Sequence, residues 1–159
     1  MIKNPRGRKN RIRRELLRAG GGTSATNSLD ILPAEEARTI LGDASLAADE
    51  EPLLACFRDP SEWYLITTQR LIWKQGHVLK SLAWEDVHGV QQGPSVVKAL
   101  VEGKVGKNSV EELEIFDAED VRYVLRLEPG DGYYLMWSSI VALCSGFLHE
   151  PEFPVFDET

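Results

Sequence analysis

The sequence predicts an α+β fold that is mainly β: a small antiparallel barrel or sandwich of about seven strands, with a C-terminal amphipathic helix and a short N-terminal helix. Three observations support this prediction. Short apolar runs separated by turn-forming residues follow one another between residues 53 and 127. Apolar side chains recur at helical spacing in residues 133–148. A shorter helical pattern precedes the first strand near residue 33.

The N-terminal helix of the domain is expected from about residue 33 to residue 41. Pro33 suits the first turn of a helix, and Glu35 and Glu36 suit its positive end. Gly42 is a natural C-terminal stop.

Strands are expected wherever a short apolar run lies between turn signals. The expected strands are residues 53–58, 63–67, 70–74, 77–84, 86–91, 110–117 and 121–127. In the second of these, alternation places Trp63, Leu65 and Thr67 on one face and Tyr64 and Ile66 on the other. Residues 94–108 fit either a helix or a loop.

The last two strands carry opposite charges that could meet across the hairpin. Arg122 and Arg126 share one face, and Glu112 and Glu114 share a face of the partner strand. Cross-strand ion pairs are therefore expected, each with a small contribution to stability.

The C-terminal helix of residues 133–148 has a broad, aromatic apolar face. This face suits packing over the open end of a barrel or between two sheets. A helix on a membrane surface is disfavoured because the polar face carries no Lys or Arg. Residues 149–159 contain two prolines and are expected to form an extended tail.

Charge divides the chain into a basic start and an acidic body. Residues 1–19 hold eight Lys and Arg against one Glu, which gives +7, so the net charge of −7 leaves −14 for the remainder. Three parts are expected: a basic flexible arm with a Gly/Ser linker (1–28), a single domain (29–148) and the tail (149–159). If the arm is helical, its apolar stripe of Ile12, Leu16 and Leu17 is too short for strong docking. The candidate anion contacts are Lys3, Arg6, Arg8, Lys9, Arg11, Arg13, Arg14 and Arg18.

The compartment expected from the sequence is the cytoplasm. No apolar run reaches the ~18 residues that cross a bilayer, and the basic start has no apolar segment typical of a secretory signal. Cys56 and Cys144 each lie in an apolar segment, and reduced, buried thiols are expected for both.

No residue pattern predicts an enzyme, a metal site or a cofactor. His77, His88 and His149 lack the spacing of metal ligands. The carboxylate runs do not follow the order of a calcium loop, so solvated faces are expected there. No catalytic, cofactor-binding or metal-binding residue is assigned.

The segment LITTQRLIWKQG, followed by LKSLAWEDV, resembles bacterial pleckstrin-homology-like domains and the related GRAM domains. The matching residues are Leu65, Thr67, Arg70, Leu71, Gly76, Trp84, Glu85, Asp86 and Val87. The resemblance implies a curled antiparallel sheet closed by a C-terminal helix. It also implies binding of phosphoinositides, peptides or proteins. Few cations flank the first hairpin, so a lipid headgroup site is disfavoured.

Two functions of different classes follow. The first is a protein-interaction module whose acidic surface binds a basic partner, for example an inhibitor or immunity-type protein for a basic nuclease or toxin. Its candidate contacts are Glu111, Glu112, Glu114, Asp117, Glu119 and Asp120. The second is binding of an anionic membrane or nucleic acid by the basic arm. The arm could also fold back on the acidic body as an autoinhibitor. The sequence does not determine oligomeric state.

Arg70 lies at the tip of a polar corner between two apolar runs, a position that fits either a reactive loop or a turn between strands. The corner Thr67-Thr68-Gln69-Arg70 is expected to be a tight turn between strands. Arg70 is expected to form a structural pair, with Glu85 or Asp86 as its partner.

Overall fold

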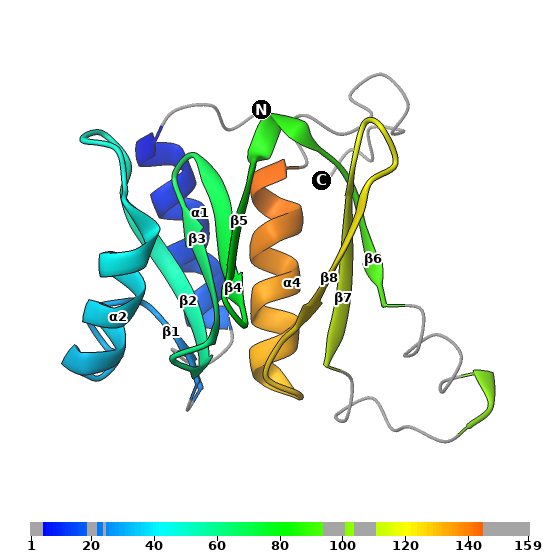
Figure 1. The fold of residues 1–159 in the computed structure, drawn as a ribbon, viewed down its shortest axis with the longest axis horizontal. Coiled ribbons are helices and arrows are strands. Elements are labelled where there is room, and N and C mark those ends of the chain that lie inside the picture. The colour runs from blue at the N-terminus through cyan, green and yellow to red at the C-terminus, as the bar shows by residue number, and fades with distance from the viewer. Residues whose placement is uncertain (1–4, 19–21, 24, 94–100, 104–110, 145–159) are drawn as a thin grey trace, which may run out of the picture.

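Two antiparallel sheets enclose one long helix in the computed structural model, which describes residues 5–18, 22–23, 25–93, 101–103 and 111–144 (Figure 1). The elements in chain order are α1 (Pro5–Arg18), β1 (Thr26–Asn27), α2 (Ala34–Ala44), β2 (Pro52–Asp59), β3 (Glu62–Thr67), β4 (Arg70–Gln75), β5 (Val78–Ala83), a 3-10 turn η1 (Trp84–Asp86), β6 (Val87–Gln92), β7 (Glu112–Asp117), β8 (Arg122–Arg126) and α4 (Asp131–Cys144). The expected tail of residues 149–159 and most of the ambiguous segment 94–108 lie outside the described residues.

The strand order confirms the predicted class, α+β and mainly β. Strands β1 to β5 form one sheet in sequential order, and β6 to β8 form a second; every neighbouring pair is antiparallel. Each of the seven expected strands overlaps one observed strand, and the short β1 adds an edge that the sequence did not predict. The two sheets do not close into one barrel within the described residues.

Helix α4 fills the space between the two sheets (Figure 1). Its side chains Tyr133, Met136 and Ile140 are fully buried among residues of both sheets. Of the two predicted positions, packing between sheets is therefore the observed one. Both cysteines are free and buried, as predicted. Burial raises the pKa of the Cys144 thiol to about 12.

Helix α2 covers the opposite face of the five-stranded sheet. Ile40 and Ala44 pack with Trp63 and Leu65 in a second, smaller apolar cluster. Tyr64 and Ile66 belong to the main cluster, so the predicted alternation along β3 is confirmed. The helix runs past its expected stop at Gly42 and ends at Ala44, and the left-handed φ of 50° at the C-cap residue Ser45 terminates it.

The basic N-terminal segment, expected to be a flexible arm, is the helix α1 and packs on the body. Ile12 is 2% exposed and belongs to the main core. The guanidinium of Arg8 is buried and donates to the backbone carbonyl of Thr68. Burial lowers the pKa of Arg8, and the nearby Glu85 carboxylate opposes this shift. Arg8 adds to the apolar stripe a long-range polar contact that the sequence does not reveal. Of that stripe, the side chains of Leu16 and Leu17 lie outside the described residues.

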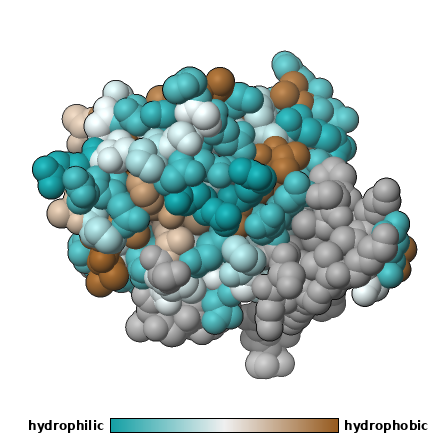
Figure 2. Space-filling view, turned by 60° about the horizontal axis from the view of Figure 1, so that its bottom comes forward, coloured by the Kyte–Doolittle hydropathy of each residue, from teal (hydrophilic) through white to brown (hydrophobic). Residues whose placement is uncertain are grey.

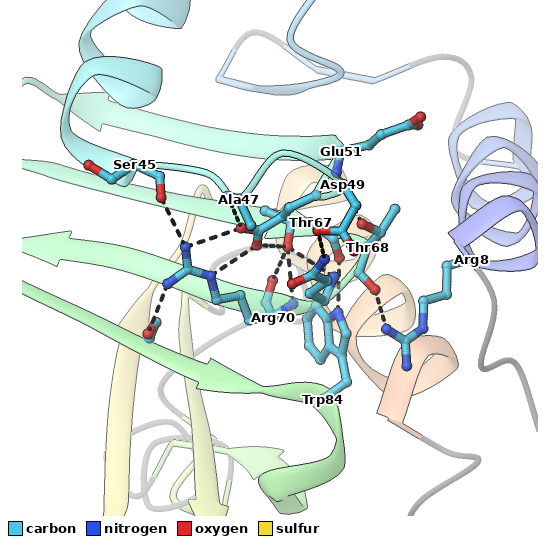
Figure 3. A network of polar contacts seen from close by, with 12 residues as sticks. Arg8, Ser45, Ala47, Asp49, Glu51, Thr67, Thr68, Arg70 and Trp84 are labelled. Atoms are coloured by element: carbon cyan, nitrogen blue, oxygen red, sulfur yellow. Dashed lines mark hydrogen bonds and ion pairs between the residues drawn. The ribbon is translucent and has the colours of Figure 1, made fainter.

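The polar corner between β3 and β4 is a tight turn, as the sequence predicted (Figure 3). The hydroxyl oxygen of Thr67 accepts hydrogen bonds from the amides of Gln69 at 3.1 Å and Arg70 at 3.0 Å. Thr68 and Glu51 exchange two further hydrogen bonds, from the Thr68 amide to the Glu51 carbonyl and from the Glu51 amide to the Thr68 hydroxyl. The corner is therefore tied to the loop that precedes β2.

An ion pair between the half-buried Arg70 and the buried Glu50 completes this corner, and its acidic partner is not one of those predicted. Arg70 donates from Nε to Glu50 Oε2 at 2.9 Å and from Nη2 to Glu50 Oε1 at 3.1 Å (Figure 3). Its predicted pairing with Glu85 or Asp86 is wrong. The β2–β3 register places Pro52 opposite Thr67, so residues just before Pro52 lie beside those just after Thr67.

The Glu50 carboxylate is 1% exposed, and each of its oxygens has donors. The Thr67 hydroxyl lies 2.6 Å from Oε2 and the Ala47 amide lies 3.1 Å from Oε1. Burial alone would raise the pKa of Glu50. The hydrogen bonds from Arg70, Thr67 and Ala47 outweigh it, so the pKa lies below its ordinary value.

A second polar cluster joins the two sheets at the far end of β3. The Tyr64 hydroxyl donates to Glu62 Oε2 at 2.7 Å and accepts from the Arg126 amide at 2.9 Å. The Arg126 guanidinium lies 3.2 Å from Glu62, and Gln75 donates to the Val124 carbonyl at 2.8 Å. Because Glu62 and Tyr64 come from the first sheet and Arg126 from the second, these bonds fix one sheet against the other.

The expected ion pairs between β7 and β8 form in part. Arg122 lies 2.6 Å from Glu114, as predicted. Arg126 lies opposite Glu112 in the strand register but pairs with Glu62 of the first sheet. The hairpin pattern places these residues on one face but carries no information about the facing sheet.

The surface view shows mostly hydrophilic residues, with hydrophobic ones scattered among them (Figure 2). Such scattered apolar residues are ordinary on a protein surface. Within the described residues, no helix combines the length and apolar character needed to cross a membrane.

Replacing Glu50 by Gln should destabilise the protein by about 2–3 kcal/mol at neutral pH, because Arg70 loses its ionised partner. A carboxyl with a depressed folded-state pKa stabilises the fold above its unfolded-state pKa of about 4.3, and this contribution is lost as pH falls through the lower folded-state value. Denaturant unfolding at a series of pH values should therefore show the difference from wild type shrinking in acid. The exposed Glu35→Gln is the control; a difference for Glu50→Gln that is constant with pH would contradict the assignment.

Replacing Ile12 by Ala should destabilise the protein by about 2–4 kcal/mol, because it leaves a cavity under α1. Thermal or denaturant unfolding measures this loss. Asn10→Ala, at an exposed position of the same helix, should change the stability by less than ~0.5 kcal/mol. Equal, small effects of both substitutions would mean that α1 does not depend on its contact with the core.

Candidate binding surface

A hollow lies where the 3-10 turn η1 meets the turn between β7 and β8. The strand register explains why these two segments meet: Val87 at the start of β6 pairs with Asp117 at the end of β7. Residues just before Val87 therefore lie beside residues just after Asp117. Glu85 and Asp86 from η1 are brought next to Asp117 and Glu119 although about thirty positions separate them in the chain.

Trp84 holds η1 in place. Its indole Nε1 donates to the Thr67 carbonyl at 2.9 Å, and its amide donates to the Gln69 carbonyl at 3.2 Å. The ring is fully buried in the main core. With Trp84 directed inward, the next two side chains of the tight turn, Glu85 and Asp86, are exposed.

The other wall of the hollow is the acidic turn between β7 and β8. Asp117 Oδ1 accepts from the amides of Glu119 at 2.9 Å and Val121 at 3.0 Å, an arrangement that stabilises the turn. Asp120 adopts a left-handed φ of 62°. The Glu119 side chain is left exposed beside the hollow.

The hollow has a volume of about 280 Å³ and a strongly acidic lining. Its lining residues are Leu82, Glu85, Asp86, Val87, His88, Asp117, Ala118 and Glu119. Four are carboxylates, and none is Lys or Arg. Leu82 and Val87 add apolar surface. This combination suits a cationic side chain, whose methylene stem can pack on apolar atoms while its head meets carboxylates.

Arg122, on β8 of the same sheet, is not among the residues that line the hollow. Arg122 pairs with Glu114 at 2.6 Å and with Asp120 at 3.0 Å. Its guanidinium lies 4.9 Å from the centre of the Phe116 ring, a cation–π contact. Gly89 makes this packing possible, because a Cβ atom there would collide with the Phe116 ring. Arg122 thus neutralises its own sheet face and leaves the hollow acidic.

The six predicted acidic contacts do not form one surface. Asp117 and Glu119 line the hollow, and Asp120 pairs with Arg122. Glu114 is buried and bonded to Gln91 and Arg122, so it is structural. Glu111 lies 4.0 Å from Arg58, and Glu112 is half-buried at the opposite end of β7. The six residues are separated because side chains alternate between the two faces of a strand, and because some of them lie at one end of β7 and some at the other.

The predicted anion contacts are dispersed in a similar way. Lys3 lies outside the described residues, as do the side chains of Arg6 and Arg18. Arg8 is buried against Thr68, and Lys9 pairs with Glu51 at 3.2 Å. Arg13 and Arg14 are exposed and Arg11 is half-buried. The helix therefore uses part of its positive charge to bind the acidic body.

Glu85 and Asp86 line the hollow but are absent from the contacts predicted from the sequence, which assigned them to Arg70. A usable signal was present: two acids directly before one strand and an acidic turn directly after another become neighbours if those strands pair. The pairing of β6 with β7 could not be predicted while the ambiguous segment 94–108 separated them. Among the described residues, no group of three or more His, Cys, Asp or Glu is arranged to hold a metal ion.

Comparison of the chain with protein-family models, curated proteins and solved structures finds no significant match.

Proposed function

We propose that this protein is a non-enzymatic interaction module that binds a basic protein partner at the acidic hollow between η1 and the β7–β8 turn. The observation that carries the proposal is the lining itself: four carboxylates from two distant segments surround 280 Å³ with no cation among the lining residues. A volume of about 280 Å³ has room for a single inserted Lys or Arg side chain.

The charge of the chain supports a basic partner. The folded chain carries a net charge of −7 with α1 packed on its body, and this charge attracts a cationic protein over long distances and speeds its association. The hollow then gives this attraction a fixed position, since Trp84 and the Asp117 turn hold its two walls. An inhibitor or immunity-type role toward a basic nuclease or toxin is the specific form that we propose.

The proposed relation to pleckstrin-homology-like domains rests on the β3–β4 corner. Thr67, Arg70 and Trp84, three residues of the resemblance, meet in one network around the buried Glu50. Successive antiparallel strands and the C-terminal helix also agree with what the resemblance implies. Protein binding is one of the activities that such a fold would carry.

The alternative proposal, binding of an anionic membrane or nucleic acid through the basic segment, has less support. Arg8 and Lys9 already contact the body, and Ile12 anchors the helix in the core. Deletion of residues 1–22 would therefore uncover the core as well as remove charge. Point substitutions at exposed positions are the better test of both proposals.

Substituting Glu85→Gln and Glu119→Gln together should weaken binding of a labelled peptide of alternating Arg and Gly by about tenfold, because two of the four carboxylates are lost. Fluorescence anisotropy at several salt concentrations measures the affinity. The salt dependence should also become shallower.

The matched control is Glu35→Gln with Glu36→Gln, which removes the same charge from α2, away from the hollow. It should change the affinity by less than about twofold. Equal losses for the two double variants would show that net charge alone attracts the peptide, and the hollow would lose its assigned role. The alternative proposal is tested by measuring binding of single-stranded DNA and of phosphatidylglycerol vesicles to the wild-type protein and to Arg14→Gln.

A further inference from the structure

A second, larger cavity lies between α1, the turn before α2 and the start of β2. Its volume is about 420 Å³, within the ~300–1,000 Å³ typical of small-molecule sites. Its lining residues are Lys9, Ile12, Arg13, Ser28, Leu29, Asp30, Pro52 and Leu53. Both its place in the fold and its charge distinguish this cleft from the acidic hollow.

The cleft has an apolar floor and a cationic rim. Ile12 and Leu53 are buried, and Leu29 and Pro52 are half-buried, so one part of the lining is aliphatic. Lys9 and Arg13 are both exposed and lie four residues apart, on one side of α1. A ligand with an apolar chain and a negative head would match both parts of this lining.

The two cations are available to a ligand at small cost. The Lys9 ammonium lies 3.2 Å from Glu51, but the two side chains are 45% and 53% exposed. Exposed pairs of this kind contribute little to stability and exchange readily with other anions. Arg13 is exposed, and Asp30 attracts it electrostatically.

Asp30 is the one negative group in the lining, and its charge is already engaged. A hydrogen bond from the Ser28 side chain, aided by the backbone amide of Asp30 and by Arg13, lowers the pKa of the Asp30 carboxyl. Asp30 therefore stays ionised, and its repulsion of an anion is opposed by the attraction of two cations, Lys9 and Arg13. The lining as a whole favours a single negative charge.

We propose that this cleft binds a single-chain amphiphile with an anionic head, of the fatty-acid or alkyl-phosphate class. The chain lies on Ile12, Leu29 and Leu53, and the head meets Lys9 and Arg13. A nucleotide does not fit this lining, since the lining holds no aromatic ring for a base to stack on. The proposal is independent of the acidic hollow, and each can fail without the other.

Sodium decanoate, kept below its micelle concentration, is the probe for this site. Titration into the 15N-labelled full chain should move the amide resonances of Leu29 and Leu53 in a saturable way. Decanol and decylamine are the controls for the head group, and both should bind at least about tenfold more weakly, because they lack the negative charge. Equal binding of all three compounds would overturn the proposal.

Three substitutions and one control locate the head and the chain of the ligand. Arg13→Gln should weaken decanoate binding by about tenfold, whereas Arg14→Gln, on an exposed residue outside the cleft, should leave it within about twofold. Asp30→Asn should tighten binding, since it removes a repulsive charge. Leu29→Phe, which fills the cleft without changing its charge, should abolish binding. A denaturant unfolding measurement confirms that this variant is folded.

Several outcomes would overturn the proposal. These are the absence of saturable shifts, equal losses for Arg13→Gln and Arg14→Gln, and unchanged binding by a folded Leu29→Phe. Phosphatidylglycerol vesicles separate a free amphiphile from a membrane surface. Binding to vesicles without binding to monomeric decanoate would favour recognition of a membrane and would also reject the cleft as a site for a free ligand.

Discussion

A carboxylate can be buried only where hydrogen-bond donors replace the water that it loses, and Glu50 meets this condition with donors from two other places in the chain. The Ala47 amide lies just before it, while the Thr67 hydroxyl and the Arg70 guanidinium lie at the β3–β4 corner. Satisfying Glu50 therefore fixes the loop before β2 against that corner, and with it the register of the central hairpins.

Both proposed binding sites depend on this corner. The Thr67 carbonyl accepts a hydrogen bond from the indole N–H of Trp84. This bond fixes η1 and directs the acids of the hollow outward. The neighbouring Thr68 carbonyl accepts a hydrogen bond from the guanidinium of Arg8 and so helps to hold α1. Other residues of α1 form one wall of the cleft. Two carbonyls of one turn thus connect the core to an acidic surface on one side and a cationic cleft on the other. Electrostatics also links them, because Glu85 in the hollow acts on Arg8 in the helix.

Most of the fold could be predicted because its signals are local. Two-residue alternation between turn signals located seven strands, and helical spacing located α2 and α4. The errors concern contacts between distant segments. The docking of α1 depends on Arg8 reaching Thr68, sixty positions away, and Arg70 found Glu50 rather than a nearer acid. Neither partner has a distinctive pattern in the sequence, since helix packing brings Arg8 to Thr68 and the β2–β3 register brings Glu50 within reach of Arg70.

By itself, the sequence determined the class of the fold, the alternating faces of β3 and the separation of a basic start from an acidic body. These properties follow from the order of side chains along the backbone and from their charges. Only the tertiary structure decided which charges are used internally and which remain available. Glu114 is buried and Arg8 is bound, whereas Glu85 and Glu119 meet at an open hollow. Pairing β6 with β7 brought Glu85 next to Glu119, because a strand register sets which distant residues become neighbours, whereas the packing of α1 on the body engaged Arg8.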